Sequence, residues 1–282
     1  MFITAPTVPD QTRTIVCRSR GHSQGYITRL MSPSDLGQIL KPFVFLDLFD
    51  NRGDDFPTFG LHPHSGLATL TYVAEGSVSY EDTNNATGIL RAGGIEWMRA
   101  GKGVWHAGGA GDPGRTRGFQ LWIALPPELE LGPSESVYLS AANIPQIGPA
   151  RVLLGEYGGA KSSIAITMPI NYLAVSLKAG EQWRYQPPRG HSVLWLAIGK
   201  GRINIAEAGV LEVGEIIIFE AGEAPVDFLA LEDAEYVIGS AVPHPHDLVL
   251  GYYSVHTSMR ALQAGETEIQ RIRHHLIEQG RL

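Results

Sequence analysis

Apolar and β-branched positions fall in many short runs along the chain, and turn-forming residues separate these runs. Residues 67–73 form one such run, and Glu75-Gly76 turns it into a second run at residues 77–82. Asn84-Asn85 marks the next turn. No long helical period lies between these segments, and short strands at close spacing are typical of a β-sandwich or barrel. The pattern therefore predicts an all-β fold for this part of the chain.

The second half of the chain repeats the pattern more faintly. The turn at residues 211–215 echoes the turn at residues 90–94 of the first half. We expect four strands in this half, at residues 164–168, 173–177, 192–198 and 215–219. The echo predicts a second barrel.

The chain is expected to divide into two domains with a helical tail. Residues 128–136 contain proline, glycine and three glutamates, and they are the best candidate for a linker. We therefore expect an N-terminal domain at residues 1–132 and a C-terminal domain at residues 133–282. From about Ser258 the apolar period becomes helical, and Gly280 stands where a helix would end.

Composition limits the class of protein. The 282 residues are 44% hydrophobic and 18% charged, which is typical of a soluble globular protein with one large or two ordinary domains. The net charge of −7 argues against a nucleic-acid or anionic-membrane surface. No apolar run reaches the roughly 18–20 residues of a membrane span, and no signal peptide is expected. We therefore expect a cytoplasmic monomer that binds neither membrane nor nucleic acid directly.

Three histidines are the strongest candidates for a functional site. Only one residue lies between His62 and His64, so in an extended strand they share a face, with Cα atoms about 6.6 Å apart. His106 follows a predicted turn at residues 100–103 and would come from a later strand. Three neutral imidazoles from two strands could bind a divalent metal and leave coordination positions open. The alternative is a barrel mouth with three polar residues and no metal.

These segments resemble the motifs of the pirin family of bicupins. His62-Pro63-His64-Ser65-Gly66 is similar to the family's H-P-H-x-G segment, and residues 97–106 are similar to its W-M-x-A-G-x-G-x-x-H-x-E segment. The resemblance continues through residues 251–257. It implies two cupin barrels, each a double-stranded β-helix or jelly roll, with a short C-terminal helical segment. It also implies one metal site, at His62, His64 and His106 in the N-terminal barrel.

Two positions depart from the family pattern. The family places a fourth ligand, a glutamate, two residues after the last histidine, where this chain has Gly108. A second carboxylate that is common in cupins is replaced by Ala68. Family members bind ferrous iron or another divalent ion, so the resemblance implies Fe²⁺ here, bound more weakly because no carboxylate offsets its charge.

The resemblance leaves open whether the protein is an enzyme. Some bacterial members are quercetin 2,3-dioxygenases, and this implies an oxidoreductase that acts on a flavonol-like or other small enolic aromatic substrate. The animal member is a nuclear transcription coregulator, and this implies a regulatory bicupin that binds a protein partner without turnover. A small-molecule sensor is a third hypothesis. No catalytic residue is assigned, and the substrate's proton could pass to Glu96 or to a bound water.

The other candidate residues have simpler interpretations. His244-Pro245-His246-Asp247 is expected to be a loop, and His191 and His256 are expected to be hydrogen-bonded packing residues. Only His191 falls near the corresponding position of the second barrel, which is therefore predicted to carry no metal. Residues 107–111 either widen the pocket beside His106 or form a flexible loop. Arg99 and Lys102 either attract an anionic substrate or are simply solvated.

Overall fold

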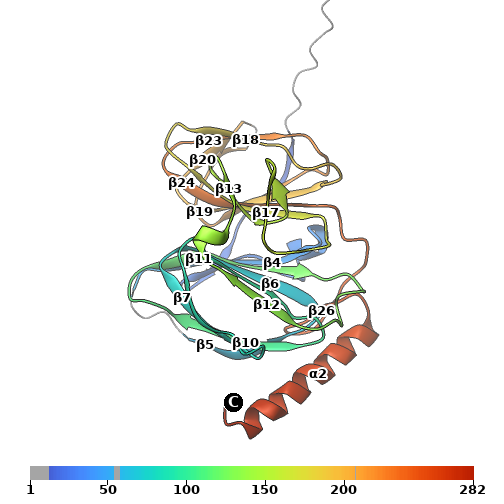
Figure 1. Cartoon of the computed structure of the whole chain (residues 1–282). Helices are drawn as coiled ribbons and strands as arrows, with labels where there is room; N and C mark the ends of the chain where they lie inside the picture. The colour runs from blue at the N-terminus through green and yellow to red at the C-terminus, as the bar shows by residue number, and fades with distance from the viewer. Residues whose placement is uncertain (1–12, 54–57, 207) are drawn as a thin grey trace, which may run out of the picture.

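Two β-barrels stack on one another, and a long C-terminal helix lies beside the N-terminal barrel (Figure 1). The computed structural model describes residues 13–53, 58–206 and 208–282. Residues 1–12, on which the expectation about a signal peptide rests, lie outside the described part of the chain. The predicted all-β, two-barrel architecture with a C-terminal helix is confirmed.

The N-terminal barrel consists of one seven-stranded and one four-stranded antiparallel sheet. The larger sheet has the order β12 (Glu135–Leu139), β9 (Ile95–Arg99), β6 (Leu67–Glu75), β11 (Thr116–Ala124), β4 (Phe43–Asn51), β3 (Ile27–Met31) and β2 (His22–Gln24). The smaller sheet has the order β5 (Phe59–His64), β10 (Val104–Ala110), β7 (Ser77–Asp82) and β8 (Thr87–Arg91). A short helix, α1 (Leu36–Ile39), precedes β4.

The C-terminal barrel repeats this arrangement sheet by sheet. Its larger sheet has the order β1 (Ile15–Arg20), β22 (Glu215–Phe219), β19 (Val193–Lys200), β24 (Ala234–Ala241), β17 (Ile170–Leu177), β14 (Ala150–Leu154) and β13 (Gln146–Ile147). Its smaller sheet has the order β18 (Gln182–Tyr185), β23 (Val226–Ala230), β20 (Ile203–Ile205) and β21 (Gly209–Leu211). The matching order makes β5 and β10 the counterparts of β18 and β23.

Short elements complete the chain. They are the hairpin of β15 (Glu156–Tyr157) and β16 (Ala160–Lys161), the pair β25 (Val249–Leu250) and β26 (Val255–His256), the 3₁₀ turn η1 (Ala141–Asn143) and the helix α2 (Met259–Glu278). The side chain of Ser258 accepts a hydrogen bond from the Ala261 amide and so caps α2, and Gly280 adopts φ +69° just beyond the helix end. None of the helices in the described part of the chain has the length and apolar character needed to cross a membrane.

Each larger sheet takes one strand from the other side of the predicted domain division. The strand β1 pairs with β22 of the C-terminal barrel, and β12 pairs with β9 of the N-terminal barrel. These two strands are exceptions to the predicted division at residues 132 and 133, which otherwise stays a prediction. The exchange ties the barrels together through backbone hydrogen bonds as well as side-chain packing.

The two larger sheets pack face to face and bury the main apolar cluster between them. Leu70 and Leu121 of the N-terminal sheet belong to one cluster with Trp195 and Val237 of the C-terminal sheet. Phe43 meets the fully buried Trp195 edge to face, with ring centroids 5.3 Å apart. Because successive side chains of a strand point to opposite faces, the residues between these positions point into the barrels.

The two barrel interiors differ in polarity. The C-terminal barrel is filled by a second apolar cluster that includes Tyr185, Leu196 and Phe228. In the N-terminal barrel, Thr71 hydrogen-bonds to Glu96 and to Gln120, so polar side chains meet inside it. Burial of polar groups costs free energy unless they are hydrogen-bonded, so this interior depends on a satisfied network.

The strand predicted at residues 164–168 and the flexible-loop alternative for residues 107–111 were wrong. Residues 164–168 form an irregular loop, and residues 107–110 belong to β10, which is paired on both sides with β5 and β7. The predicted linker contains Glu130, whose side chain is 3% exposed. Its carboxylate accepts hydrogen bonds from the Thr257 amide and hydroxyl, both at 2.7 Å, so this segment anchors the C-terminal region.

Candidate metal centre

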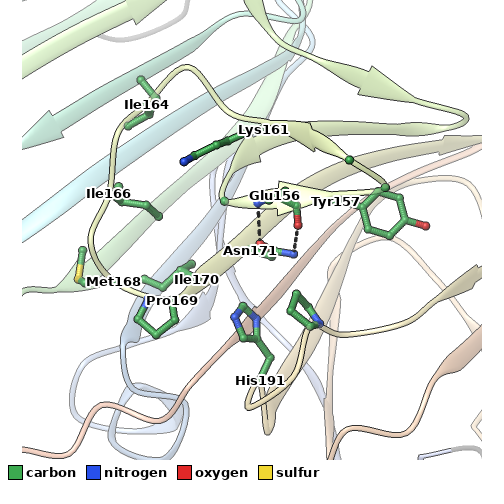
Figure 2. Close-up of a pocket in the computed structure, with 14 residues that line it drawn as sticks. Glu156, Tyr157, Lys161, Ile164, Ile166, Met168, Pro169, Ile170, Asn171 and His191 are labelled. Carbon is green, nitrogen blue, oxygen red and sulfur yellow. Dashed lines mark hydrogen bonds between the residues drawn. The ribbon is translucent and has the colours of Figure 1, made fainter.

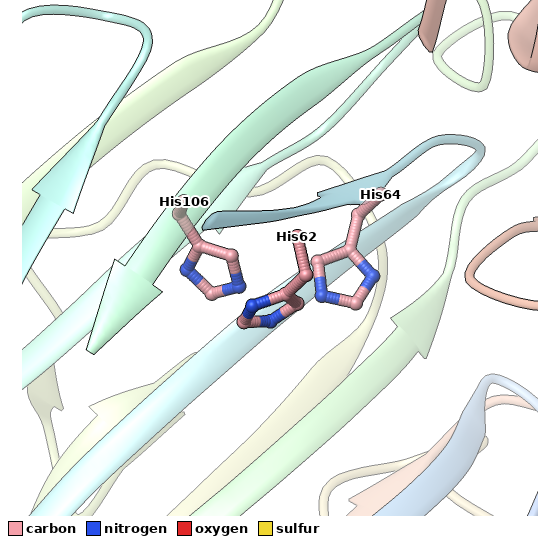
Figure 3. Close-up of side chains that lie close together, drawn as sticks. All are labelled: His62, His64 and His106. Atoms are coloured by element: carbon pink, nitrogen blue, oxygen red, sulfur yellow. The ribbon is translucent and has the colours of Figure 1, made fainter. Parts of the chain in front are cut away.

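The structure brings His62, His64 and His106 together on two adjacent strands (Figure 3). His62 and His64 lie on β5 with Pro63 between them, and His106 lies on β10 directly opposite His62 in the strand register. The turn predicted at residues 100–103 is present, and Gly101 adopts φ +53° there. The shared face of the H-P-H pair and the delivery of His106 from a later strand are therefore confirmed as geometry.

The three rings form one compact cluster. The ring centroids of His62 and His106 are 4.4 Å apart, and that of His64 is 5.2 Å from His62 and 5.1 Å from His106. One ring nitrogen of each histidine lies within 4.8 Å of the other two. His64 and His106 are buried, whereas His62 is half-buried. The cluster could hold a metal ion.

An oxygen acceptor at each Nδ1 determines the tautomer of all three rings. The Nδ1 of His62 lies 2.9 Å from the carbonyl of Gly60, and the Nδ1 of His64 lies 3.0 Å from the carbonyl of Tyr253. The Nδ1 of His106 lies 3.3 Å from a carboxylate oxygen of Glu96. Carbonyl and carboxylate oxygens only accept, so each Nδ1 carries a proton, and in the neutral ring Nε2 keeps its lone pair. Ring nitrogens held in this way are typical of metal-binding histidines.

Glu96 lies behind His106 in a buried hydrogen-bond network. Besides His106, its carboxylate accepts from the Thr71 hydroxyl at 2.7 Å and from the Tyr138 hydroxyl at 3.4 Å. Burial alone would raise the pKa of Glu96, but the hydrogen bonds from His106, Thr71 and Tyr138 hold that pKa below its usual value. The network therefore places one ionised carboxylate next to the histidine cluster.

Burial keeps the imidazoles of His62 and His64 neutral. It lowers the pKa of His62 to about 4, with a further contribution from His106. It also lowers the pKa of His64 well below the ordinary value. The Nε2 atom of His106 is buried and has no hydrogen-bond partner among the described residues. A buried lone pair without a partner is costly, and a bound cation would satisfy it. The residues present therefore fit a divalent metal.

Gly108 stands where a fourth ligand would be expected, and its surroundings leave room for a side chain. It lies on β10 two residues after His106, opposite Tyr80 of β7, and its φ is not positive. A Cβ atom added there would meet only the Ser79 carbonyl oxygen, at 3.6 Å. Nothing in the local backbone requires glycine at this position. Ala68, the other departure, is fully buried in β6.

Three other histidines, His191, His244 and His256, are buried away from the cluster. His191 hydrogen-bonds to Ser240 at 2.9 Å, and His256 lies between Ser65 and Glu130 at 3.0 and 3.2 Å. Both interpretations from the sequence are confirmed. His244 and His246 lie in an irregular segment, as predicted.

Of the two charged residues near the cluster, Arg99 is held by an acidic partner. Arg99 forms an ion pair with Glu135 at 2.7 Å. Lys102 lies on the turn between β9 and β10, where its backbone amide donates to the Gly132 carbonyl. The structure thus favours the structural interpretation of Arg99 over substrate attraction.

Sequence reasoning missed the groups that hold the three rings. Glu96 is 6% exposed and lies inside the barrel, next to the Nδ1 of His106. A signal was present: Thr71, Glu96 and Gln120 are polar residues with an apolar residue on each side in the sequence. Alternation of this kind marks a polar barrel interior. The Tyr253 carbonyl had no such signal, because it comes from a segment 189 residues beyond His64.

Comparison with known proteins agrees with this geometry. The sequence model of the Pirin family matches residues 25–123. A pirin-like protein of Caulobacter vibrioides is 30% identical over 227 residues, which cover 77% of this chain and 81% of the relative. A Pseudomonas aeruginosa protein, provisionally named quercetin 2,3-dioxygenase, is 31% identical over 218 residues, 71% of this chain and 72% of its own length.

Solved structures show the same fold. A quercetin 2,3-dioxygenase from Acinetobacter baumannii has a TM-score of 0.85 at 23% identity, covering 93% of this chain and 98% of that protein. A bacterial pirin from Escherichia coli, solved in complex with nickel(II), has a TM-score of 0.62 at 20% identity. The match covers 82% of this chain and 98% of that protein. The fold and the histidine cluster define a bicupin with a candidate metal centre. The chain belongs to the pirin family.

The depressed histidine pKa values predict that acid destabilises the metal-free protein. Unfolded histidine has a pKa near 6.5, so between about pH 6.5 and 4 the unfolded chain binds protons that folded His62 and His64 do not. The free energy of unfolding should therefore fall as the pH is lowered through this range. Urea denaturation of chelator-treated protein at pH 7 and pH 5 measures the effect.

In the variant His62→Asn, the free energy of unfolding should differ less between pH 7 and pH 5, because one of the titrating groups is gone. His274→Asn, which changes an exposed histidine of α2, is the matched control and should behave as the native protein. An unchanged pH dependence in His62→Asn would contradict the argument from burial.

Proposed function

We propose that the N-terminal barrel binds one divalent metal, with ferrous iron as the expected ion, through the Nε2 atoms of His62, His64 and His106. We propose further that the protein is a dioxygenase that acts on a flavonol-like or other enolic aromatic compound. One observation carries the proposal: all three rings are held by oxygen acceptors at Nδ1, and their Nε2 lone pairs are left for one cation. The buried, unpartnered Nε2 of His106 adds to it.

The surroundings of the cluster suit a planar aromatic substrate. The ring of Trp122 lies edge-on to His64 at 4.8 Å and stacks on Phe45 at 4.1 Å. The guanidinium of Arg29 lies 4.0 Å over the other ring of this stack and is ion-paired with Asp47. Aromatic walls with a few placed polar groups are typical of small-molecule sites.

Each protein group has a separate role in this proposal. A divalent ion held by the three histidines would supply a Lewis acid and, as iron(II), redox chemistry toward an enolic substrate and dioxygen. His62 and His64 supply neutral ligands, so no proton must be removed from them at neutral pH. Glu96 orients His106 and places a negative charge beside the Nδ1 of that ring.

Glu96 is a positioning residue in this scheme and not the acceptor of the substrate's proton. It contacts the Nδ1 side of His106, opposite the Nε2 that would face the ion. Both of its oxygens already accept hydrogen bonds from protein donors. The proposal therefore assigns the substrate's proton to solvent water.

Similarity to other proteins supports the same class of reaction. The Acinetobacter baumannii structure is titled quercetin 2,3-dioxygenase, and the Pseudomonas aeruginosa relative carries that name provisionally. Neither name identifies the substrate of this chain. The competing hypothesis is a partner-binding pirin without turnover, and the experiment below separates the two.

Metal content and oxygen uptake test the proposal directly. Protein loaded anaerobically with iron(II) should retain about one ion per chain by elemental analysis. Oxygen uptake with quercetin should exceed that of the chelated protein. His62→Ala should lose both the ion and the activity, because two imidazoles alone bind weakly.

His191→Ala is the matched control, because it removes a buried histidine from the other barrel, and it should keep the ion. Retention of iron by His62→Ala, or its loss from His191→Ala, would contradict the site. Bound iron without oxygen uptake on any enolic aromatic would favour the partner-binding hypothesis.

Glu96→Gln should weaken iron binding by about 10–100-fold, the range that loss of a ligand-orienting partner usually costs. The amide has nearly the same shape, but it removes the negative charge and can present its NH₂ group to His106. The apparent dissociation constant from competition with a chelator measures the change. Glu135→Gln changes an exposed acid that pairs with Arg99, and it should leave the affinity unchanged. Equal iron affinities of Glu96→Gln and Glu135→Gln would rule out the assigned role of Glu96.

Gly108→Glu should tighten iron binding, because a carboxylate would add a hard oxygen ligand to a set of neutral imidazoles. The backbone accepts a side chain here, so the variant is expected to fold. Gly111→Ala is a contrasting variant: its added Cβ would lie 2.3 Å from the Ser77 hydroxyl, so it should be destabilised. Unchanged or weaker iron affinity in folded Gly108→Glu would place residue 108 away from the ion.

A further inference from the structure

The helix α2 packs against the outer face of the two strands that carry the three histidines. Because side chains alternate along a strand, the neighbours of the inward-facing histidines on β5 and β10 point outward. Leu61 and Trp105 are two such neighbours, and they belong to one apolar cluster with Ile269, Ile272 and Leu276 of the helix. The indole of Trp105 also donates to the Ile269 carbonyl at 3.1 Å. Figure 1 shows the helix beside the N-terminal barrel.

Ser65, the residue after His64, is joined to the segment that returns from the C-terminal barrel. Its hydroxyl lies 2.9 Å from the Ser254 hydroxyl, and its carbonyl accepts from the Val255 amide at 3.2 Å. Both serines are buried. Tyr253, the residue before Ser254, supplies the carbonyl that lies 3.0 Å from the Nδ1 of His64. The serines therefore join the two backbones directly beside the hydrogen bond that orients His64.

A glutamate lies at each end of this serine pair. Ser254 donates to the carboxylate of Glu266 on α2 at 2.7 Å. On the other side, the Nε2 of His256 lies 3.0 Å from the Ser65 hydroxyl, and its Nδ1 lies 3.2 Å from the carboxylate of Glu130. These five side chains form one chain of hydrogen bonds, the serine network.

The carboxylates at the two ends determine the direction of these hydrogen bonds. Carboxylates only accept, so Ser254 donates to Glu266 and accepts from Ser65, and Ser65 accepts from the Nε2 of His256. Burial lowers the pKa of His256, whereas Glu130 and Glu266 act to raise it. The network therefore needs one proton beyond those of a neutral histidine beside two ionised glutamates.

An amide at position 266 would remove this need for a proton. The NH₂ group of a glutamine could donate to Ser254, and each serine would then donate in the opposite direction, ending at the Nε2 of a neutral His256. A glutamine at this position can thus complete the network, whereas an alanine cannot.

Gly265 brings the backbone of α2 directly onto the serine network. A Cβ atom added there would overlap the Ser65 hydroxyl and lie 2.6 Å from the Nε2 of His256. Ser65 and His256 are both fully buried beneath the helix. Buried hydrogen bonds of this kind hold their geometry, because a polar group that loses its partner there is not compensated by water.

We propose that the serine network is a positioning element of the metal centre, in which Ser65, Ser254 and His256 hold the Tyr253 carbonyl against the Nδ1 of His64. The inference rests on the proposed metal centre. A fixed Nδ1 keeps the Nε2 of the ring directed at the ion, and loss of such an orienting partner usually weakens metal binding about 10–100-fold. Through Glu266 and Gly265, α2 contributes to the affinity for the ion although it carries none of the three histidines.

NMR of nitrogen-15-labelled histidine rings in the metal-free protein tests the network without the ion. The Nδ1–H signal of His64, assigned by its loss in His64→Asn, should exchange slowly with solvent in the native protein. Ser254→Ala removes the hydroxyl between Ser65 and Glu266, so it should speed this exchange about tenfold, the effect of one lost hydrogen bond. The Nδ1–H of His106, which Glu96 holds, should keep its native rate, whereas general destabilisation would speed both.

The affinity for iron(II), measured by competition with a chelator, tests the consequence for the ion. Ser254→Ala and Glu266→Ala should weaken binding by at least about tenfold. Glu266→Gln should retain most of the native affinity, because the amide completes the network in the opposite direction. Glu268→Ala is the matched control: it removes an acid of the same helix that pairs with the exposed Arg271, and it should bind iron as the native protein does.

A pair of histidine variants gives a second comparison. His256→Asn should weaken iron binding, since the shorter side chain cannot reach both Ser65 and Glu130. His191→Asn changes a buried histidine that lines a pocket of about 380 Å³ on the C-terminal barrel (Figure 2), and it should leave the affinity unchanged.

Native exchange of the His64 hydrogen or native iron affinity in Ser254→Ala would overturn the proposal. So would equal iron affinities of Glu266→Ala and Glu266→Gln, or a loss of affinity in Glu268→Ala as large as that in Glu266→Ala. A native protein that binds no iron would contradict the proposed function. The exchange measured on the metal-free protein would still decide whether the serine network holds His64.

Discussion

The face-to-face packing of the two seven-stranded sheets is the constraint on which the rest of the structure depends. The apolar residues of both sheets meet there, with Trp195 at the centre, and burial of this surface is the main stabilising contribution. Since side chains alternate along a strand, the packing also decides which residues point into each barrel. The three histidines lie on β5 and β10 of the smaller N-terminal sheet, and the apolar C-terminal interior combines residues from both sheets of its barrel.

The candidate metal centre is held by groups from the whole chain. Glu96 from β9 orients His106, and the backbone carbonyl of Tyr253, which follows the second barrel, orients His64. The buried contacts of Ser65 with Ser254 and His256 fix that returning segment against the end of β5. The C-terminal half therefore contributes to the site although it supplies none of the three ring ligands.

The two barrels share strand order but differ in chemistry. On β18 and β23, the counterparts of the histidine-bearing strands, Trp183 and Phe228 stack with ring centroids 5.6 Å apart. Apolar packing at these positions stabilises the second barrel without hydrogen-bonded polar groups. In this barrel, hydrogen bonds connect Asn171 through Tyr185 and Ser240 to His191.

The sequence by itself determined the all-β class, the doubled pattern, the C-terminal helix and the three histidines, because strand alternation and the H-P-H spacing are local properties of the chain. It did not determine the role of Glu96, the carbonyl at His64 or the exchange of β1 and β12 between the sheets. Hydrogen bonds between residues far apart in sequence decide these features, and the pattern of residues within one segment does not predict such bonds. The burial of Glu130 and the irregular backbone of residues 164–168 were likewise decided by tertiary contacts, which override local propensity.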